Sequence, residues 1–155
     1  MSSFYALSFN VKNAYDRYLF KIFENIDICA YNWLVEIADT IDGKYSIGDG
    51  SLFEQDIMSG NLFYDCISKD EYYIISLNVR AYKDHIVHEQ IRFLEDFCKS
   101  KCEILLLCID VTEFIFLCKD NALFEQVQKN CNCYGFENIK RLNEEECRAI
   151  GDLSS

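Results

Sequence analysis

Two apolar runs joined by a short polar junction, at residues 103–120, constrain the fold more than any other part of the chain. The first run, EILLLCID, is nearly all apolar, as is typical of a strand buried on both faces. The second, VTEFIFLCKD, follows at once, and the junction from Ile109 to Glu113 predicts a tight antiparallel hairpin. In such a hairpin Cys108 and Cys118 are small buried side chains and not a metal or redox site.

Alternating and helical apolar patterns predict the remaining elements. The predicted strands are 4–11, 31–38, 71–82 and 136–142, with a further short strand at 44–47 in a turn-rich segment, 39–51. The predicted helices are 14–26, a short one near 60–68, 86–100, 120–135 and a closing turn or two at 143–150. Asn13 and Asp120 are candidate N-caps, and Gly135 is the expected end of its helix.

These elements predict an α+β fold with a single mixed, mainly antiparallel sheet and helices packed on one of its faces. Half of the residues are hydrophobic and 15% are aromatic, which is enough apolar material for a core. The chain has 155 residues and no proline. We therefore expect one domain spanning residues 1–155.

Three segments together resemble a known family. They are YLFKIFENIDICAYNWLV at 18–35, EYYIISLNVRAY at 71–82 and CEILLLCIDVTEFIFLCKD at 102–120. Their order and spacing are similar to those of small uncharacterised proteins from Bacillus, Clostridium and relatives, which form a family with a domain of unknown function. The resemblance covers most of the chain and implies a cytosolic, single-domain bacterial protein. It brings no active-site residue with it.

The cysteines indicate a reducing compartment. The chain has nine of them, an odd number, and several lie in apolar strand-like runs. The N-terminus shows no secretory signal, and no apolar run reaches the roughly 20 residues that a membrane-spanning helix needs. We therefore expect free thiols and a cytoplasmic protein without a membrane segment.

The charge excludes some partners and favours others. The formal net charge is −11 at pH 7, which disfavours nucleic acids and anionic membranes. Residues 24–68 contain nine acidic residues and one basic residue, Lys44, interleaved with aromatic side chains. This segment predicts either a solvated acidic surface or a patch that binds a basic protein.

Three kinds of metal or catalytic site are alternatives to a binding patch. Cys98, Cys102, Cys131 and Cys133 are candidate zinc ligands, but neither pair has the C-x-x-C spacing. A cysteine nucleophile needs a histidine, and the only two are His85 and His88. The acids of 39–56 invite metal-assisted catalysis, yet acids in glycine-containing turns are usually solvated. The chain also lacks the glycine-rich phosphate-binding motifs.

We therefore predict a non-catalytic acidic binding protein, of the kind represented by immunity and inhibitor proteins, that occludes a basic protein partner. We assign no catalytic residue, no metal ligand and no cofactor. The predicted partner-binding residues combine aromatic anchors with carboxylates: Trp33, Asp39, Asp42, Tyr45, Asp49, Glu54 and Asp56.

The alternative prediction is a small enzyme or a small-ligand binder. Its pocket is expected near His85 and His88, beside the strand at 71–82. It requires a concave site that contains at least one of the two histidines.

Overall fold

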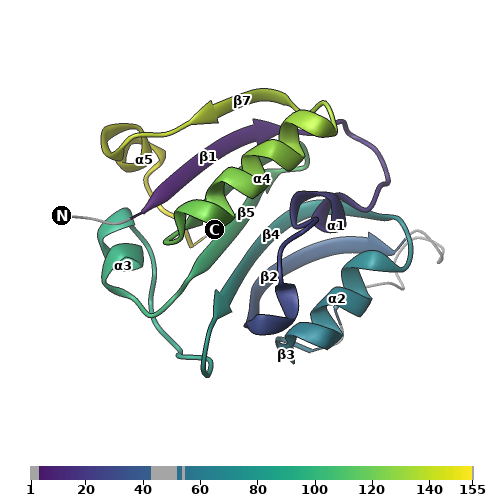
Figure 1. Ribbon diagram of the computed structural model, residues 1–155, viewed down its shortest axis with the longest axis horizontal. Coiled ribbons are helices and arrows are strands. Elements are labelled where there is room, and N and C mark those ends of the chain that lie inside the picture. The colour runs from purple at the N-terminus through teal and green to yellow at the C-terminus, as the bar shows by residue number, and fades with distance from the viewer. Residues whose placement is uncertain (1–3, 43–51, 54, 155) are drawn as a thin grey trace.

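The computed structural model describes residues 4–42, 52–53 and 55–154, with the main chain alone at Asp39, Ile41 and Asp42. The described residues form one seven-stranded sheet, in which every pairing is antiparallel. Across the sheet the strands are β3 (Ile57–Ser59), β2 (Asn32–Asp42), β4 (Tyr72–Tyr82), β5 (Ile104–Asp110), β6 (Glu113–Cys118), β1 (Tyr5–Asn10) and β7 (Glu137–Arg141). Strands β3 and β7 form the opposite edges (Figure 1). The predicted α+β class is confirmed.

The central hairpin is the one predicted from the two apolar runs. Strands β5 and β6 pair from Ile104 with Cys118 to Asp110 with Glu113, and the turn contains Val111 at a φ of 51°. Cys108 and Cys118 are fully buried. Because apolar side chains cover both faces of this hairpin, the thiols are part of the core.

One face of the sheet is covered by α1 (Tyr18–Ile22), the 3-10 turn η1 (Ile28–Ala30), α2 (Gly60–Ser68) and α4 (Asn121–Cys133) (Figure 1). Aromatic side chains dominate this layer. Trp33 of β2 stacks on Phe63 of α2 with ring centroids 4.0 Å apart. The Tyr72 hydroxyl donates a hydrogen bond to the Ile67 carbonyl oxygen at 3.0 Å and accepts one from the Leu19 N–H at 3.0 Å.

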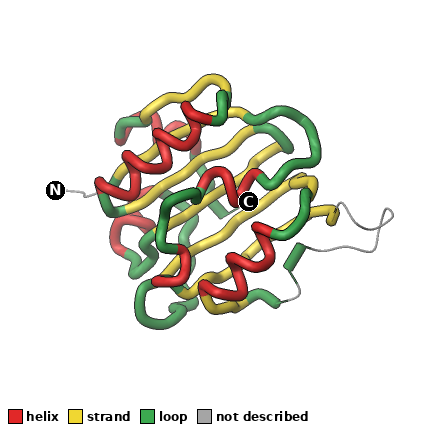
Figure 2. The backbone as a smooth tube through the Cα atoms, turned by 45° about the vertical axis from the view of Figure 1, so that its right-hand side comes forward, coloured by secondary structure: helices red, strands yellow, loops and turns green. Residues whose placement is uncertain are grey.

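Helices cover the other face as well, which corrects the prediction of helices on one face. The helices α3 (Leu94–Lys99) and α5 (Glu144–Ile150) pack on it (Figure 2). Their buried contacts come from Leu105 and Leu107 of β5 and from Leu117 of β6. The nearly continuous apolar run of β5 is explained by this arrangement, since both of its faces are covered.

Some predicted boundaries are wrong, and contacts distant in sequence explain why. Residues 86–93 are not helical, and only Leu94–Lys99 forms the predicted helix of 86–100. The predicted helix of 14–26 is confined to Tyr18–Ile22, because the main chain of Asp16 pairs with that of Tyr72 in an extended bridge. Strand β2 continues to Asp42, through residues predicted as turns.

Two predicted caps have different outcomes. Asn13 caps no helix, and its side-chain oxygen accepts a hydrogen bond from the Tyr73 hydroxyl at 2.5 Å. Asp120 does cap α4, since its carboxylate accepts the Leu123 N–H at 2.9 Å. Gly135 follows that helix at a φ of 71°, as expected of a helix end. The predicted strand at 44–47 lies outside the described residues.

Candidate functional site: the hollow beside strand β3

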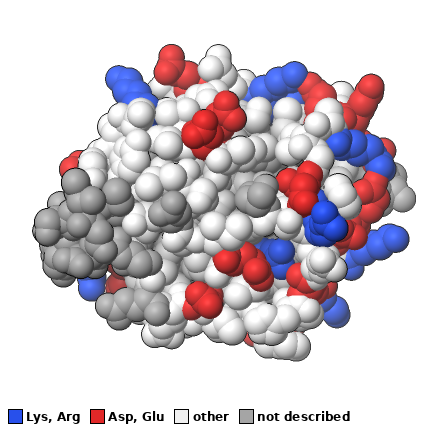
Figure 3. Space-filling model, turned by 180° about the vertical axis from the view of Figure 1, so that it is seen from behind, with Lys and Arg blue, Asp and Glu red and all other residues white. Residues whose placement is uncertain are grey.

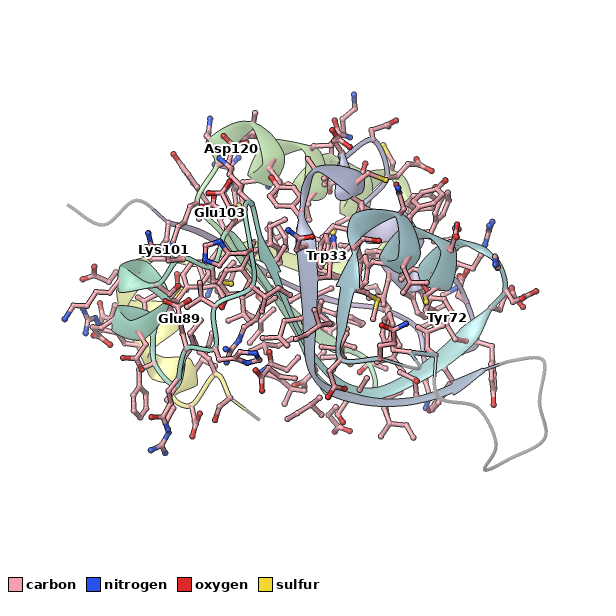
Figure 4. The ribbon with its side chains drawn as sticks, turned by 90° about the horizontal axis from the view of Figure 1, so that it is seen from below. Trp33, Tyr72, Glu89, Lys101, Glu103 and Asp120 are labelled. Atoms are coloured by element: carbon pink, nitrogen blue, oxygen red, sulfur yellow. The ribbon has the colours of Figure 1, made fainter. Side chains whose placement is uncertain are left out.

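Trp33 belongs to the core, so its predicted role as a surface anchor is wrong. Its side chain is 0% exposed and its indole N–H donates to the Ile28 carbonyl oxygen at 3.1 Å (Figure 4). Side chains alternate along a strand, and Trp33 shares with Val35 the face of β2 that the α1–α2–α4 layer covers. Burial within that layer leaves no surface for a partner to contact.

The other predicted partner-binding residues fall into three groups. Asp39 and Asp42 lie on β2, paired in register with Ser76 and Tyr72, and the structure describes only their main chain. Tyr45, Asp49 and Glu54 lie outside the described residues. Asp56 is exposed immediately before β3, and its carbonyl oxygen accepts the Val35 N–H at 2.7 Å. Of the predicted set, Asp56 is the side chain that the structure places at the surface.

A hollow with a volume of about 510 Å³ lies beside β3, and Asp56 is not among its lining residues. Its walls combine apolar and polar side chains from β2, β3, α2 and the segment after β4: Asn32, Gln55, Ile57, Met58, Ser59, Leu62, Asp84, His85 and Ile86. Ile57 is 47% exposed, which is unusual for a branched aliphatic side chain on a strand. An exposed apolar group in a hollow is a typical feature of a binding site.

Local hydrogen bonds and one glycine hold the walls of the hollow. The Asn32 amide donates to the Asp84 carbonyl oxygen at 2.7 Å, which ties the segment after β4 to β2. Ser59 caps α2, because its hydroxyl accepts the Leu62 N–H at 3.3 Å. Gly60 lets η1 approach α2, since a Cβ there would lie 2.4 Å from the Cys29 Cα.

Glu89 fixes the far end of the same segment. Its carbonyl oxygen accepts the Arg80 guanidinium N–H at 2.7 Å, and its carboxylate accepts the Tyr82 hydroxyl at 3.1 Å. The carboxylate also accepts the Lys101 main-chain N–H at 3.1 Å, and Glu89 and Lys101 lie close together in Figure 4. Burial, with the nearby Cys102 and Glu89, raises the pKa of Tyr82. These contacts replace the predicted helix at 86–93 and are structural.

Acidic groups surround this end of the molecule. Asp84 lines the hollow, and both Asp84 and Asp56 are exposed. Nearby, Tyr31 is half-buried, and its pKa is raised by burial and then by the Glu103 and Asp120 carboxylates. From behind, the molecule shows a largely uncharged surface with acidic groups on it and most basic groups toward the rim (Figure 3). A cationic group is therefore favoured near the hollow.

The candidate zinc ligands do not converge. Cys98 and Cys102 belong to the layer under α3 and α5, whereas Cys131 belongs to the layer on the opposite face of the sheet. Cys133 is exposed at the end of α4. Within residues 4–42, 52–53 and 55–154, no group of three or more His, Cys, Asp or Glu side chains is arranged to hold a metal ion.

The two histidines have different surroundings. His85 is exposed and lines the hollow, while His88 is exposed and is not among its lining residues. The buried thiols are poor nucleophiles, since burial raises the pKa of Cys102, Cys108, Cys118 and Cys131 to about 12. His85 thus lines an open hollow, and the alternative prediction of a small-ligand pocket stays a prediction.

Sequence comparison places the chain among known proteins. The family described as "Protein of unknown function (DUF2691)" matches residues 4–149. The chain belongs to this family. The chain is similar to the "Uncharacterized protein YncE" of Bacillus subtilis (strain 168), with 25% identity over 140 residues, which are 90% of this chain and 92% of the relative. No solved structure matches the chain significantly.

This family match agrees with the resemblance inferred from the three segments. The family match assigns no activity and no site residue. None of the helices in the described part of the chain has the length and apolar character needed to cross a membrane.

Most residues of the hollow have no clear signal in the sequence. Ile57, Ser59 and Asp84 were not singled out, because they lie in short segments whose patterns are weak. One signal was present: Ser59 directly precedes the helix at 60–68, and a serine at that position is typical of an N-cap. Nothing in the sequence indicated that the segment after β4 approaches β3.

Proposed function

We propose that the protein is a non-catalytic, cytoplasmic binding protein, acting as an immunity or inhibitor protein that occludes a basic protein partner. The observation that carries this proposal is the hollow beside β3, where Ile57 is 47% exposed and Asp56 and Asp84 are exposed nearby. An apolar anchor site with the exposed carboxylate of Asp84 in its lining fits a partner surface with an apolar side chain beside a lysine or arginine.

The charge of the whole chain supports the same partner class. The net charge of −11 attracts a basic protein over a distance, and this attraction weakens as salt shortens the screening length. The nine cysteines are thiols and not disulfides, which supports a reducing compartment. Catalysis requires an activated group, whereas the buried thiols have raised pKa values.

Affinity capture from a Bacillus subtilis lysate tests the proposal, since a relative occurs in that organism. We expect the wild-type chain to retain a basic protein at about 0.01 M salt and to release it near 1 M, where charges are screened within about 3 Å. The double variant Asp56→Lys/Asp84→Lys should retain at least about tenfold less of it, because like charges then face each other.

The matched control reverses two exposed acids elsewhere, Asp65→Lys/Glu145→Lys, and leaves the hollow unchanged. It alters the net charge equally, so it should lower retention far less than the variant at the hollow. Equal retention by the wild type and Asp56→Lys/Asp84→Lys would show that the partner does not bind here.

A second candidate function is the binding of a small molecule in the same hollow. Its volume of about 510 Å³ lies within the roughly 300–1,000 Å³ of ligand pockets, and His85 and Asp84 offer polar contacts. Native mass spectrometry of the purified protein tests this. A bound mass that is lost in Leu62→Trp, whose larger side chain fills the hollow, supports it, and an unliganded mass counts against it.

A further inference from the structure

Strand β3 lies at an edge of the sheet, next to the hollow. The strand order ends at β3, and no strand among the described residues pairs with its outer side. The Val35 N–H donates to the Asp56 carbonyl oxygen, and the register continues with Trp33 opposite Met58. Hydrogen-bonding direction alternates along an antiparallel strand, so the N–H groups of Ile57 and Ser59 point away from β2.

Side chains beside this edge are arranged as a receptor for an extended segment. Ile57 is exposed in the hollow, with Leu62 and Ile86 on its walls. In an added strand, alternate side chains lie on the same face. When the main chain of that strand pairs with β3, one of these side chains reaches the hollow. Edge strands in monomeric proteins are usually blocked by charge, proline or cover, and Ile57 provides no charge at this position.

We propose that the partner binds as an extended strand added to the free edge of β3. An apolar side chain of the partner enters the hollow, and a flanking lysine or arginine approaches Asp84 or Asp56. This inference rests on the proposed function and specifies how the basic partner is recognised.

Charge identifies the occupant as a basic segment and not as a second copy of the chain. Pairing two β3 edges brings together two acidic chains, each with a net charge of −11 and with Asp84 exposed beside the edge. Like charges placed opposite each other across paired strands are destabilising. A basic segment instead places lysine or arginine side chains near the acidic groups and neutralises them.

Ser59 provides a variant that tests the main-chain contact. Its φ is −68°, the value that proline requires, and its N–H points outward. Ser59→Pro removes that N–H and the capping hydroxyl, whereas Ser59→Ala removes only the hydroxyl. The difference in peptide affinity between these two variants therefore measures the contribution of the Ser59 N–H at the edge. Circular dichroism checks that both remain folded.

The probe is a blocked heptapeptide of alternating lysine and valine, measured by titration calorimetry with the full chain. We expect it to bind the wild type and Ser59→Ala similarly, and Ser59→Pro at least about fivefold more weakly, as expected for one lost hydrogen bond. The same peptide with alternate amides N-methylated keeps its side chains but cannot pair, so it should bind the wild type at least about tenfold more weakly.

The outcomes separate this inference from the proposed function. If the unmodified and N-methylated peptides bind equally, or if neither binds, strand addition is wrong, and the lysate capture still decides the proposed function. If the wild-type chain captures no basic protein at low salt, the proposed function is wrong; if Asp56→Lys/Asp84→Lys captures the basic partner normally, the partner binds elsewhere and strand addition at β3 is wrong. A wild-type dimer in sedimentation that Ser59→Pro dissociates makes a second copy the occupant and overturns the inference.

Discussion

At the scale of single residues, Gly60 has little room for any side chain. A Cβ at this position would lie 2.4 Å from both the Cys29 Cα and the Ile28 carbonyl oxygen. These neighbours are main-chain atoms, which cannot move aside without shifting η1. The close approach of η1 to α2 supports the stacking of Phe63 on Trp33. A glycine is therefore required here by space and not by backbone conformation.

We expect Gly60→Ala to lower the free energy of unfolding by about 1–3 kcal/mol, as overpacked sites do. Urea denaturation followed by the fluorescence of Trp33, the single tryptophan, measures it. Asn61→Ala, at the next and exposed position of α2, is the control and should change stability little. Equal stabilities of the two variants would contradict the crowding at Gly60.

The nine thiols are expected to differ in reactivity because burial controls thiolate formation. Cys29 and Cys133 are exposed, whereas burial raises the pKa of Cys102, Cys108, Cys118 and Cys131 to about 12. In the native protein at pH 8 we expect iodoacetamide to alkylate the two exposed cysteines first. Peptide mass mapping identifies the sites. Rapid native labelling of Cys108 or Cys118 would contradict the buried hairpin.

At the scale of elements, the helices on the second face depend on carboxylates at their N-termini. In α5 the Glu146 carboxylate accepts the Asn143 N–H at 3.0 Å, and the Asn143 side chain accepts the Glu146 N–H at 2.8 Å. The Lys140 ammonium group and the Asn143 N–H lower the pKa of Glu146. Hydrogen bonds from Phe93 and Arg92 likewise lower the pKa of Asp96 in α3.

This layer should therefore loosen in acid. A carboxyl whose folded-state pKa is lowered stabilises the fold above its ordinary pKa of about 4.3, and the contribution is lost as pH falls through the folded-state value. We expect Glu146→Gln to be less stable than the wild type at pH 7 and equally stable near pH 2, as measured by urea denaturation. Glu145→Gln removes the same charge from an exposed position, and an identical pH profile for both variants would contradict the capping role.

At the scale of the whole molecule, the excess of acidic groups opposes the compact state. The net charge is −11 at pH 7, and the ion pairs of the described residues, such as Arg141 with Glu125, are mostly exposed. Exposed pairs contribute little to stability, while the repulsion among unbalanced carboxylates acts across the molecule. A basic partner reduces this repulsion on binding, so charge connects stability with the proposed function.

Salt should consequently stabilise the protein at neutral pH. Raising the ionic strength from about 0.01 M to 0.15 M shortens the screening length from about 30 Å to 8 Å. We expect the midpoint of thermal unfolding at pH 7 to rise. Near pH 4.5, the isoelectric point, the net charge is close to zero and the rise should disappear. A midpoint that falls with salt at pH 7 would show that ion pairs outweigh the repulsion.

The sequence determined those features that depend on local pattern. The hairpin of β5 and β6, the long strand β4 and the cap of α4 by Asp120 follow from apolar periodicity and from short polar junctions. Such signals are local in sequence, so they need no knowledge of neighbouring elements. The α+β class and the family followed from the same segments.

The tertiary structure decided which elements meet. The first half of the helix predicted at 86–100 is absent because Arg80 and Tyr82 bind Glu89 and keep residues 86–93 extended away from helical structure. Trp33 is buried because α2 covers its face of β2, although an aromatic residue in an acidic segment also fits a surface anchor. The hollow forms only where β3, α2 and the segment after β4 come together, and contacts between residues so far apart in sequence have no local pattern to predict them.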